Sequence, residues 1–383
     1  MWYTKNYSKL YRKISIMKLE KIRNIINSII FNIRKIIEKI PKKIIIAFII
    51  LILLWIILGI IDIISNKILE KDAKHGVVVE SDAKLYTKPK ESKWMHKKDF
   101  KLGENVYILK EEEKQGKIWY KVKTGKKIGY VLKGDVDFFE FSDEEIVLMS
   151  DVSKFNVLYK HFTTAGEFEA FILKSNINYV YIRAGGRGYG EKGNFYTDPN
   201  FEIFIEACEY LGVPYGFYYI DEAINSEEID EEVEFMEKFI KENATDLCVL
   251  PLVIDIEKHD GTGRADQLWE ERASLATELI QKFKEKDIET LIYSNANLIN
   301  EYLYTIDTKF WIAYYDLAQK VPNHWYTETD EEAAENKEFT DKIIGWQFTE
   351  SGAGDDIPYP VDISVVKNAY FKKYVTESVL EKK

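Results

Sequence analysis

The chain has 383 residues, of which 46% are hydrophobic and 14% aromatic, so it can form two or three domains with a sizeable core. Its net charge of −11 is uneven: residues 1–43 hold 12 Lys or Arg and two acidic residues, whereas the remainder holds 41 basic and 62 acidic residues. The acidic composition after residue 43 argues against a nucleic-acid-binding protein. The two parts of the chain are therefore expected to face different surroundings.

The first 64 residues predict a membrane anchor. Residues 44–61 are an uncharged run rich in Ile and Leu, and Ile63 and Ile64 can extend it. At about 1.5 Å per residue, a helix over 44–64 covers the ~30 Å hydrocarbon core of a bilayer. The run is too long, and starts too late, for a cleaved signal peptide. The basic block before it predicts a cytoplasmic N-terminus, and hence a single-pass cell-membrane protein whose later residues are extracellular.

The basic tail over 1–43 also contains a helical pattern. Between residues 19 and 40, Ile recurs on one face and Lys or Arg occupies the other. This pattern predicts an amphipathic helix on anionic lipid. The alternative is a basic tail without regular structure.

Residues 65–75 form a predicted linker, after which residues 76–142 show short apolar runs separated by turn residues. This pattern indicates a small all-β barrel. Its motifs are Leu85-Tyr86-x-x-Pro89, Leu102-x-x-Gly-x-x-Val-x-Ile108, Trp119-Tyr120-Lys121-Val122 and Gly129-Tyr130-Val131. They resemble the bacterial SH3-type domains of cell-wall enzymes. The resemblance implies binding of wall peptide, and a spacer barrel without a ligand is the alternative.

From residue 146 to 375, predicted strands alternate with predicted helices. The strands are 146–149, 179–183, 215–220, 248–256, 290–294, 310–315 and 343–348, and the helices include 201–211, 229–241, 268–286 and 298–303. Strands spaced in this way call for a parallel sheet, and a unit of this length suits an α/β barrel. Residues 376–383 remain as a tail.

The predicted strand over 248–256 leads into two carboxylates, Asp255 and Glu257. Because strand side chains alternate, both point to the same side, with Cα atoms about 6.5–7 Å apart. Ionising two carboxylates in an apolar site is costly, so this pair does not serve stability. The alternative is a strand that emerges into an acidic loop.

Polar residues also close other predicted strands, and aromatic residues lie nearby. In a β/α barrel the carboxyl ends of the strands form one face, and that face carries the chemistry. Aromatic rings mixed with carboxylates also suit sugar rings. The candidate substrate-binding residues are Arg183, Tyr218, Tyr219, Tyr293, Tyr314, Trp346 and Gln347.

Several motifs run along the whole of residues 146–375. They are Asp151-Val152-Ser153, Tyr179-Val180-Tyr181-Ile182-Arg183-Ala184, Gly216-Phe217-Tyr218-Tyr219, Leu252-Val253-Ile254-Asp255-Ile256-Glu257, Ile292-Tyr293-Ser294, Trp311-Ile312-Ala313-Tyr314, Trp346-Gln347-Phe348-Thr349 and Val361-Asp362-Ile363. Together they resemble the glycoside hydrolase family 25 lysozymes, the Chalaropsis-type muramidases. The resemblance implies an irregular β/α barrel that cleaves the β-1,4 bond after N-acetylmuramic acid in peptidoglycan.

Glycoside cleavage needs a proton donor and negative charge beside an oxocarbenium-like state. Crowding Asp151, Asp255, Glu257 and Asp362 onto one rim should raise the pKa of at least one of them. We expect Glu257 to be the general acid/base. Asp255 would stabilise the cationic intermediate, as a nucleophile or by orienting the substrate N-acetyl group, and the other two would position this pair. Neither a metal nor an organic cofactor is implied.

The chain departs from the family pattern at several places. Ser150 replaces a glycine, and Ser364 replaces an asparagine. Phe155-Asn156 lie near the place of an expected Trp/Tyr-Gln-Gly motif, and residues 327–336 resemble an acidic insertion.

Two other functions stay open for the chain. One is a catalytically inactive, wall-binding membrane protein, and the other is a different polysaccharide hydrolase or deacetylase on a similar barrel.

Overall fold

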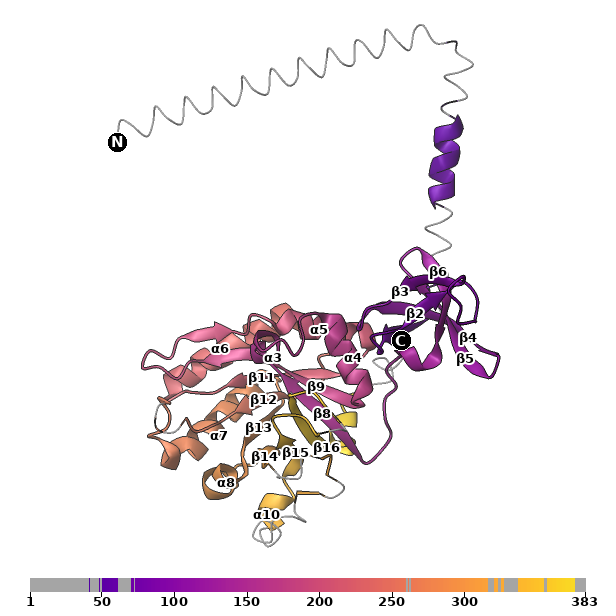
Figure 1. Cartoon of the computed structure of the whole chain (residues 1–383). Coiled ribbons are helices and arrows are strands. Elements are labelled where there is room, and N and C mark those ends of the chain that lie inside the picture. Colours follow the sequence, from indigo (N-terminus) through magenta and orange to yellow (C-terminus); the bar gives the residue numbers. More distant parts are fainter. Residues whose placement is uncertain are drawn as a thin grey trace. The chain divides into compact units, whose positions relative to one another are not determined.

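The structure is a computed structural model. It describes residues 73–375 except 260, 262, 316–319, 323–324, 327–336 and 355–356, and before them only residues 41, 48, 50–60 and 70–71. The chain divides into two compact units, Met1–Asp72 and Ala73–Lys383. Figure 1 shows their elements.

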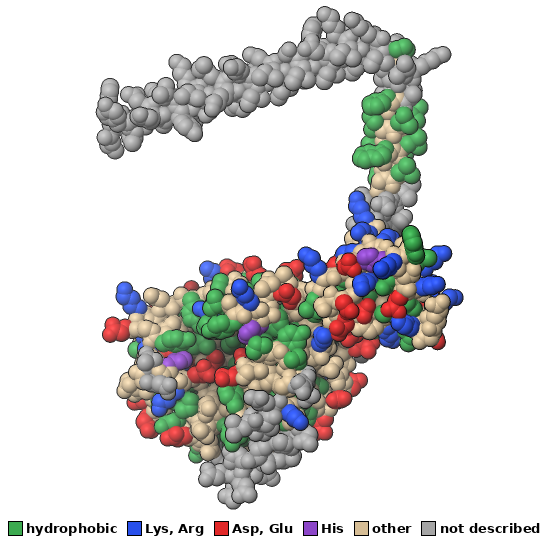
Figure 2. Space-filling model, in the orientation of Figure 1, with side chains coloured by type: hydrophobic (Ala, Val, Ile, Leu, Met, Phe, Trp, Pro, Cys, Tyr) green, Lys and Arg blue, Asp and Glu red, His purple; other side chains and the backbone are tan. Residues whose placement is uncertain are grey.

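In the first unit, residues 50–60 form a helix, and hydrophobic side chains cover its surface (Figure 2). Trp55, the most exposed of them, is 78% exposed. Within the described part of the chain, no helix is both long and apolar enough to cross a membrane. Most of the remaining residues of the predicted span over 44–64, and all of the predicted amphipathic helix over 19–40, lie outside the described residues.

The second unit begins with a seven-stranded antiparallel sheet in the order β3-β2-β6-β5-β4-β1-β7. Its strands are β1 (Lys74–Val78), β2 (Lys84–Tyr86), β3 (His96–Asp99), β4 (Asn105–Lys114), β5 (Lys117–Thr124), β6 (Lys127–Leu132) and β7 (Val136–Asp137), with the short helix η1 (Lys133–Asp135) before β7. The β4–β5 hairpin turns through Gln115 and Gly116, both at positive φ, the geometry that two-residue hairpins favour. The all-β character of this region agrees with the sequence prediction, and its likeness to SH3-type domains stays a prediction.

The larger part of this unit is a closed barrel of eight strands, which confirms the predicted α/β barrel. The strands are β8 (Ile146–Val152), β9 (Ile177–Arg187), β11 (Tyr215–Ile220), β12 (Leu252–Asp255), β13 (Thr290–Asn295), β14 (Phe310–Ala313), β15 (Ile343–Thr349) and β16 (Asp362–Lys367), and β10 (Phe195–Thr197) pairs with β9. The helices are α3 (Lys154–Leu158), α4 (Ala165–Lys174), α5 (Phe201–Leu211), α6 (Ser226–Asn243), α7 (Trp269–Glu285), α8 (Ala296–Leu298), η2 (Ile299–Leu303), α10 (Lys337–Thr340) and α11 (Asn368–Lys372).

One strand corrects the predicted parallel sheet. β16 was not predicted as a strand, and it runs antiparallel to both of its neighbours, β15 and β8. Its first residue, Asp362, therefore lies at the same end of the barrel as the carboxyl ends of the parallel strands. Register confirms this placement, because Asp362 pairs with Asp151 near the end of β8.

Local sequence sets the limits of the outer helices. Asn225 caps α6 by accepting a hydrogen bond from the backbone N–H of Glu228, and Thr164 caps α4 in the same way through Glu167. α5 ends at Gly212, which adopts the left-handed conformation that favours glycine. These helices pack apolar faces on the barrel, as Phe204, Ala207, Cys208 and Leu211 of α5 show.

The small sheet is attached to the barrel by specific contacts. The Tyr210 hydroxyl of α5 donates to the backbone carbonyls of Gly76 and Val106, both at 3.2 Å. The ring of His75 stacks on the Tyr210 ring, with centroids 4.9 Å apart. At a second contact, Gly103 meets Gly166 of α4 so closely that a Cβ on Gly166 would lie 2.0 Å from the Gly103 carbonyl oxygen.

We predict that Gly166→Ala destabilises the protein by about 1–3 kcal/mol, the usual cost of overpacking. Helix propensity alone favours Ala by about 1 kcal/mol, but the clash is with backbone that cannot rotate away. Gly134→Ala is the control, because a Cβ there meets nothing within 4 Å. Thermal unfolding of the two variants decides the matter, and equal melting temperatures would contradict the prediction.

Candidate active site

Four carboxylates gather at the end of the barrel where the parallel strands finish. Asp255 is the last residue of β12, and Glu257 follows it by two positions. Asp151 lies one residue before the end of β8, and the antiparallel β16 contributes Asp362 as its first residue. The fold thus brings together all four residues that the sequence predicts to be catalytic.

Asp151 and Asp362, the acid pair, lie opposite each other where β8 pairs with β16. Gln347 Nε2 donates to Asp151 Oδ1 at 2.9 Å. Burial raises the pKa of Asp151 to about 7, against the opposing effect of the Gln347 hydrogen bond. Burial also raises the pKa of Asp362, and the charge of Asp151 raises it further. The pair can therefore hold a proton at neutral pH.

Asp255 and Glu257 are perturbed in the same direction. Burial raises the pKa of Asp255 well above its ordinary value, and the charges of Glu257 and Asp151 add to the effect. Burial also raises the pKa of Glu257, while His259 opposes this rise. The Oδ1 atom of Asp255 is buried and has no hydrogen-bond partner among the described residues. Such an atom can accept a hydrogen bond from a bound ligand.

Gln347 connects the acid pair to two tyrosines. Its Oε1 accepts hydrogen bonds from the hydroxyls of Tyr293, at 2.8 Å, and Tyr315, at 3.0 Å. These bonds fix the amide so that Nε2 points at Asp151. Gln347 and Tyr293, both predicted to bind substrate, therefore lie at the carboxyl cluster.

Arg183 supplies a positive charge next to the cluster. Its guanidinium pairs with Asp198 through Nε and Nη2, each 2.8 Å from Oδ2. Both side chains are buried, and the Arg183 charge opposes the rise in the pKa of Asp255. Tyr218 lies near this arginine and the acids: burial raises the pKa of its hydroxyl, and Arg183 opposes that rise. Arg183 and Tyr218 thus lie beside the carboxyl cluster, and their part in substrate binding stays a prediction.

Three other predicted substrate-binding residues pack away from the carboxyl cluster, Tyr219 and Trp346 on the outer side of their strands and Tyr314 just after β14, which corrects those predictions. Tyr219 is fully buried, with its ring 6.0 Å from that of Phe283 in α7. Trp346 donates through Nε1 to the backbone carbonyl of Tyr314 at 2.6 Å, and both rings pack on Tyr326. Side chains alternate along a strand, so Tyr219 and Trp346, the neighbours of inward-pointing Tyr218 and Gln347, point outward.

Sequence reasoning missed further residues at the site. Tyr315 ends the predicted strand over 310–315 and was not included among the substrate-binding candidates, although it lies two positions beyond inward-facing Ala313. Tyr189 comes from the β9–β10 connection and Tyr196 from the short strand β10, and Asp255 acts electrostatically on both hydroxyls. No pattern in the sequence marks these two, because one lies in an irregular segment and the other in a strand of three residues. Asp198, the partner of Arg183, is likewise visible only in the fold.

The departures from the family pattern have structural roles. Ser150 Oγ donates to the Asp362 backbone carbonyl at 2.9 Å, and Trp311 Nε1 donates to Ser364 Oγ at 2.9 Å. Ser153 and Asn156 form a reciprocal capping box at the start of α3, directly after Asp151-Val152. These bonds hold the strands that carry the acid pair.

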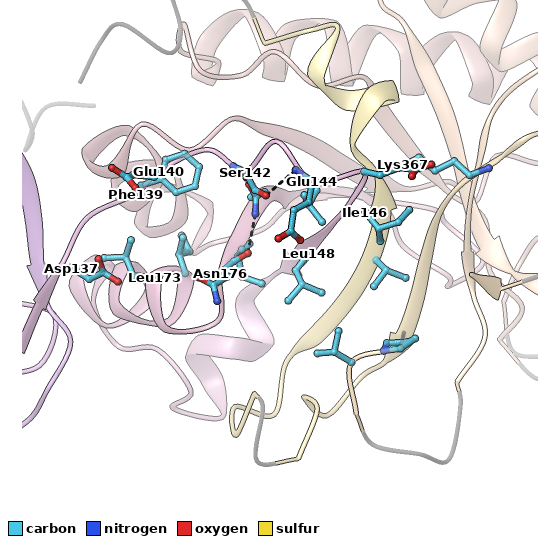
Figure 3. Close-up of a pocket in the computed structure, with 18 of the residues that line it drawn as sticks. Asp137, Phe139, Glu140, Ser142, Glu144, Ile146, Leu148, Leu173, Asn176 and Lys367 are labelled. Atoms are coloured by element: carbon cyan, nitrogen blue, oxygen red, sulfur yellow. Dashed lines mark hydrogen bonds between the residues drawn. The ribbon is translucent and has the colours of Figure 1, made fainter. Parts of the chain in front are cut away.

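A cavity of about 960 Å³ lies at the opposite end of the strands (Figure 3). It is lined by the start of β8 at Ile146, the start of β9 at Ile177 and the end of β16 at Lys367. None of the four carboxylates lines it. In β/α barrels, chemistry takes place at the carboxyl ends of the strands, so we place the active site at the carboxylates and not in this cavity.

The arrangement can hold a protonated carboxyl beside an ionised one, which glycoside cleavage requires. Among the described residues, no group of three or more His, Cys, Asp or Glu is arranged to hold a metal ion. A closed barrel with a carboxyl cluster of this kind suits a glycoside hydrolase. The sequence model of glycosyl hydrolases family 25 matches residues 151–357, more than half of the chain. The chain belongs to this family and is a glycosidase of the lysozyme, or muramidase, class.

Solved structures with a similar fold include three enzymes at low identity. The spore cortex lytic enzyme SleM of Clostridium perfringens is 20% identical, with a TM-score of 0.44, over 60% of this chain and 69% of that one. The autolysin LytC of Streptococcus pneumoniae is 18% identical, with a TM-score of 0.44, over 68% of this chain and 58% of that one. The catalytic domain of endolysin ply40, from bacteriophage P40 of Listeria monocytogenes, is 16% identical, with a TM-score of 0.43, over 61% and 98%. The comparison with curated proteins found no match.

Proposed function

We propose that the chain is a membrane-anchored N-acetylmuramidase, which cleaves the β-1,4 bond between N-acetylmuramic acid and N-acetylglucosamine in peptidoglycan. The observation that carries the proposal is the gathering of Asp151, Asp255, Glu257 and Asp362 at one end of the barrel, the first two buried and the other two half-buried, where desolvation raises the pKa of each. Similar solved structures include a phage endolysin in complex with a peptidoglycan analogue. Neither a metal nor an organic cofactor enters this proposal.

Glu257 is the proton donor in the proposed reaction. Its carboxyl gives a proton to the glycosidic oxygen as the bond from that oxygen to the anomeric carbon of the muramic acid breaks. The oxygen keeps the bonding electron pair and leaves as a hydroxyl of the glucosamine. The Glu257 carboxylate then takes a proton from water, whose oxygen bonds to the anomeric carbon. A raised pKa keeps the donor protonated near neutral pH.

In this mechanism Asp255 faces the developing cation, and Asp151 and Asp362 position Asp255 and Glu257. The buried, unpartnered Oδ1 of Asp255 suits the N–H of an N-acetyl group on the sugar. An N-acetyl group held in this way can turn its carbonyl oxygen toward the anomeric carbon. Tyr218, Tyr293 and Gln347 would position the sugar, and Arg183 balances the negative charge.

Mass spectrometry of fragments released from purified peptidoglycan tests this activity. The expected products end in reducing N-acetylmuramic acid, because the broken bond follows that sugar. Fragments that end in reducing N-acetylglucosamine, or sugars that lose acetate with the strand intact, would identify a different enzyme and overturn the proposal.

We place the anchor at residues 44–64, with the N-terminus in the cytoplasm and the barrel facing the wall. The support is the uncharged apolar run, together with the basic excess of residues 1–43. Protease added to intact protoplasts is then expected to degrade the barrel while a cytoplasmic marker protein survives. A barrel that stays protected under these conditions would contradict this topology.

We assign residues 76–142 to wall binding, from their resemblance to SH3-type domains of cell-wall enzymes. Deleting residues 77–140 is expected to reduce co-sedimentation with purified peptidoglycan. Cleavage of short soluble glycan fragments, measured together with thermal unfolding, is the control that shows whether the barrel stays intact without its contacts to the small sheet. Equal sedimentation with and without the domain would indicate a spacer instead.

A further inference from the structure

A single residue, Ile256, joins the two central carboxylates, and its backbone sets where they lie. β12 ends at Asp255, and Glu257 follows two residues later. Contacts beyond the strand ladder must therefore set the position of Glu257. Because the geometry between an acid and the atom that it protonates governs the rate, small shifts of this segment matter to catalysis.

The first peptide unit of this segment, between Asp255 and Ile256, is held by backbone on both sides. Its carbonyl oxygen, which belongs to Asp255, accepts a hydrogen bond from the N–H of Asp221, just after β11, at 3.0 Å. Its N–H, which belongs to Ile256, donates to the carbonyl oxygen of Tyr293 in β13 at 3.0 Å. β12 pairs in parallel with both of these strands, so the two bonds fix the backbone of Asp255 between its neighbours.

The second peptide unit, between Ile256 and Glu257, is held by a side chain. The Ser294 hydroxyl donates to the Ile256 carbonyl oxygen at 2.5 Å. Ser294 lies in β13 and is fully buried, so bulk water does not compete for this bond. Its neighbour Tyr293 donates to Gln347 at the carboxyl cluster, so strand alternation turns Ser294 to the outer side of the barrel, away from substrate.

We infer that Ser294 is a positioning residue whose hydroxyl locks the peptide unit that carries Glu257, and so sets the proton donor relative to Asp255. The inference rests on the proposed roles of these two carboxylates. Without the hydroxyl, the buried Ile256 carbonyl loses this donor, and its peptide unit can turn toward another one. Such a turn moves the Glu257 backbone directly, because the same peptide unit contains the Glu257 nitrogen.

The test separates kcat from KM for full-length variants acting on a soluble muramic-acid glycan. Ser294→Ala removes the donor and little volume. Its kcat should fall about five- to fiftyfold, because a misplacement of about 1 Å can cost about 10²-fold in rate. KM should stay within about twofold of the parent value, since Ser294 does not touch the sugar. Ser294→Thr keeps a hydroxyl and should recover most of the lost kcat.

Tyr181→Phe is the matched control, at the other end of the same strand. The Tyr181 hydroxyl is buried and donates to the Pro251 carbonyl oxygen, just before β12, at 3.0 Å. Each substitution removes one buried donor to a backbone carbonyl, so the two should lower the melting temperature by similar amounts. When both are assayed below the onset of unfolding, Ser294→Ala should lose kcat and Tyr181→Phe should not.

Three results would overturn the inference. They are a kcat loss in folded Ser294→Ala no larger than that in Tyr181→Phe, a loss that appears in KM alone, and a folded Ser294→Thr as slow as Ser294→Ala. If Glu257→Gln retains activity, the proposed function fails instead.

Discussion

Glu257→Gln is expected to lower kcat on purified walls by about 10²–10⁴-fold, the usual contribution of a general acid. This corresponds to roughly 3–5 kcal/mol of activation barrier. Gln is nearly isosteric with Glu and keeps its packing beside Asp255, but it has no carboxyl proton to donate. Asp255→Asn should also reduce turnover, and the two losses should not add, because both act on one transition state.

The same substitution should not destabilise the fold. Burial raises the pKa of Glu257, so the folded state disfavours its ionised form. For such a group, the folded state binds the proton more tightly than the unfolded state, and stability falls as pH rises through the two pKa values. A neutral amide removes that cost above the folded pKa. The melting temperature of Glu257→Gln at neutral pH is therefore expected to match or exceed that of the parent.

Turbidity clearing of purified walls, with thermal unfolding alongside, measures both effects. Glu271→Gln on the exposed surface of α7 is the matched control and should retain full activity. If folded Glu257→Gln keeps more than about a tenth of the parent rate, its loss is below the general-acid range and the mechanism is wrong.

The barrel could be predicted because its parallel strands are continuous apolar runs. The strand predicted over 215–220 matches β11, and that over 290–294 is one residue shorter than β13. β16 was missed as a strand because its apolar segment is short. Its antiparallel direction was missed because nothing in the sequence marks the direction of a strand. α4 (Ala165–Lys174) was missed although it has a capping Thr164, since its helical pattern lies in an aromatic-rich stretch.

The site was harder to predict from sequence, because it depends on which face of each strand points inward. Every residue of β15 is buried, so polarity does not separate inward Gln347 from outward Trp346. The spacing of Asp255 and Glu257 was visible because two carboxylates in an apolar strand are unusual. Asp362 was suggested by the family resemblance, and its position became explicable only when β16 proved to be antiparallel.

Asp198→Ala is expected to destabilise the protein by about 3–5 kcal/mol, the cost of leaving one partner of a buried ion pair alone. The Asp198 carboxylate binds the Arg183 guanidinium and accepts backbone N–H bonds from Lys154 at 2.8 Å and Asn200 at 3.0 Å. Lys154 opens α3 just after Asp151, so the substitution also loosens the segment that carries one of the four carboxylates.

Thermal unfolding measures this loss. A destabilisation of that size should lower the melting temperature by about 6–20 °C in a domain of this length. Asp143→Ala is the matched control, because Asp143 pairs with Lys372 on the exposed surface and such a pair contributes about 1 kcal/mol or less. Asp198→Asn should lose less than Asp198→Ala, since the amide oxygen can still accept a backbone N–H. Equal melting temperatures for Asp198→Ala and Asp143→Ala would show that the buried pair does not hold this side of the active site together.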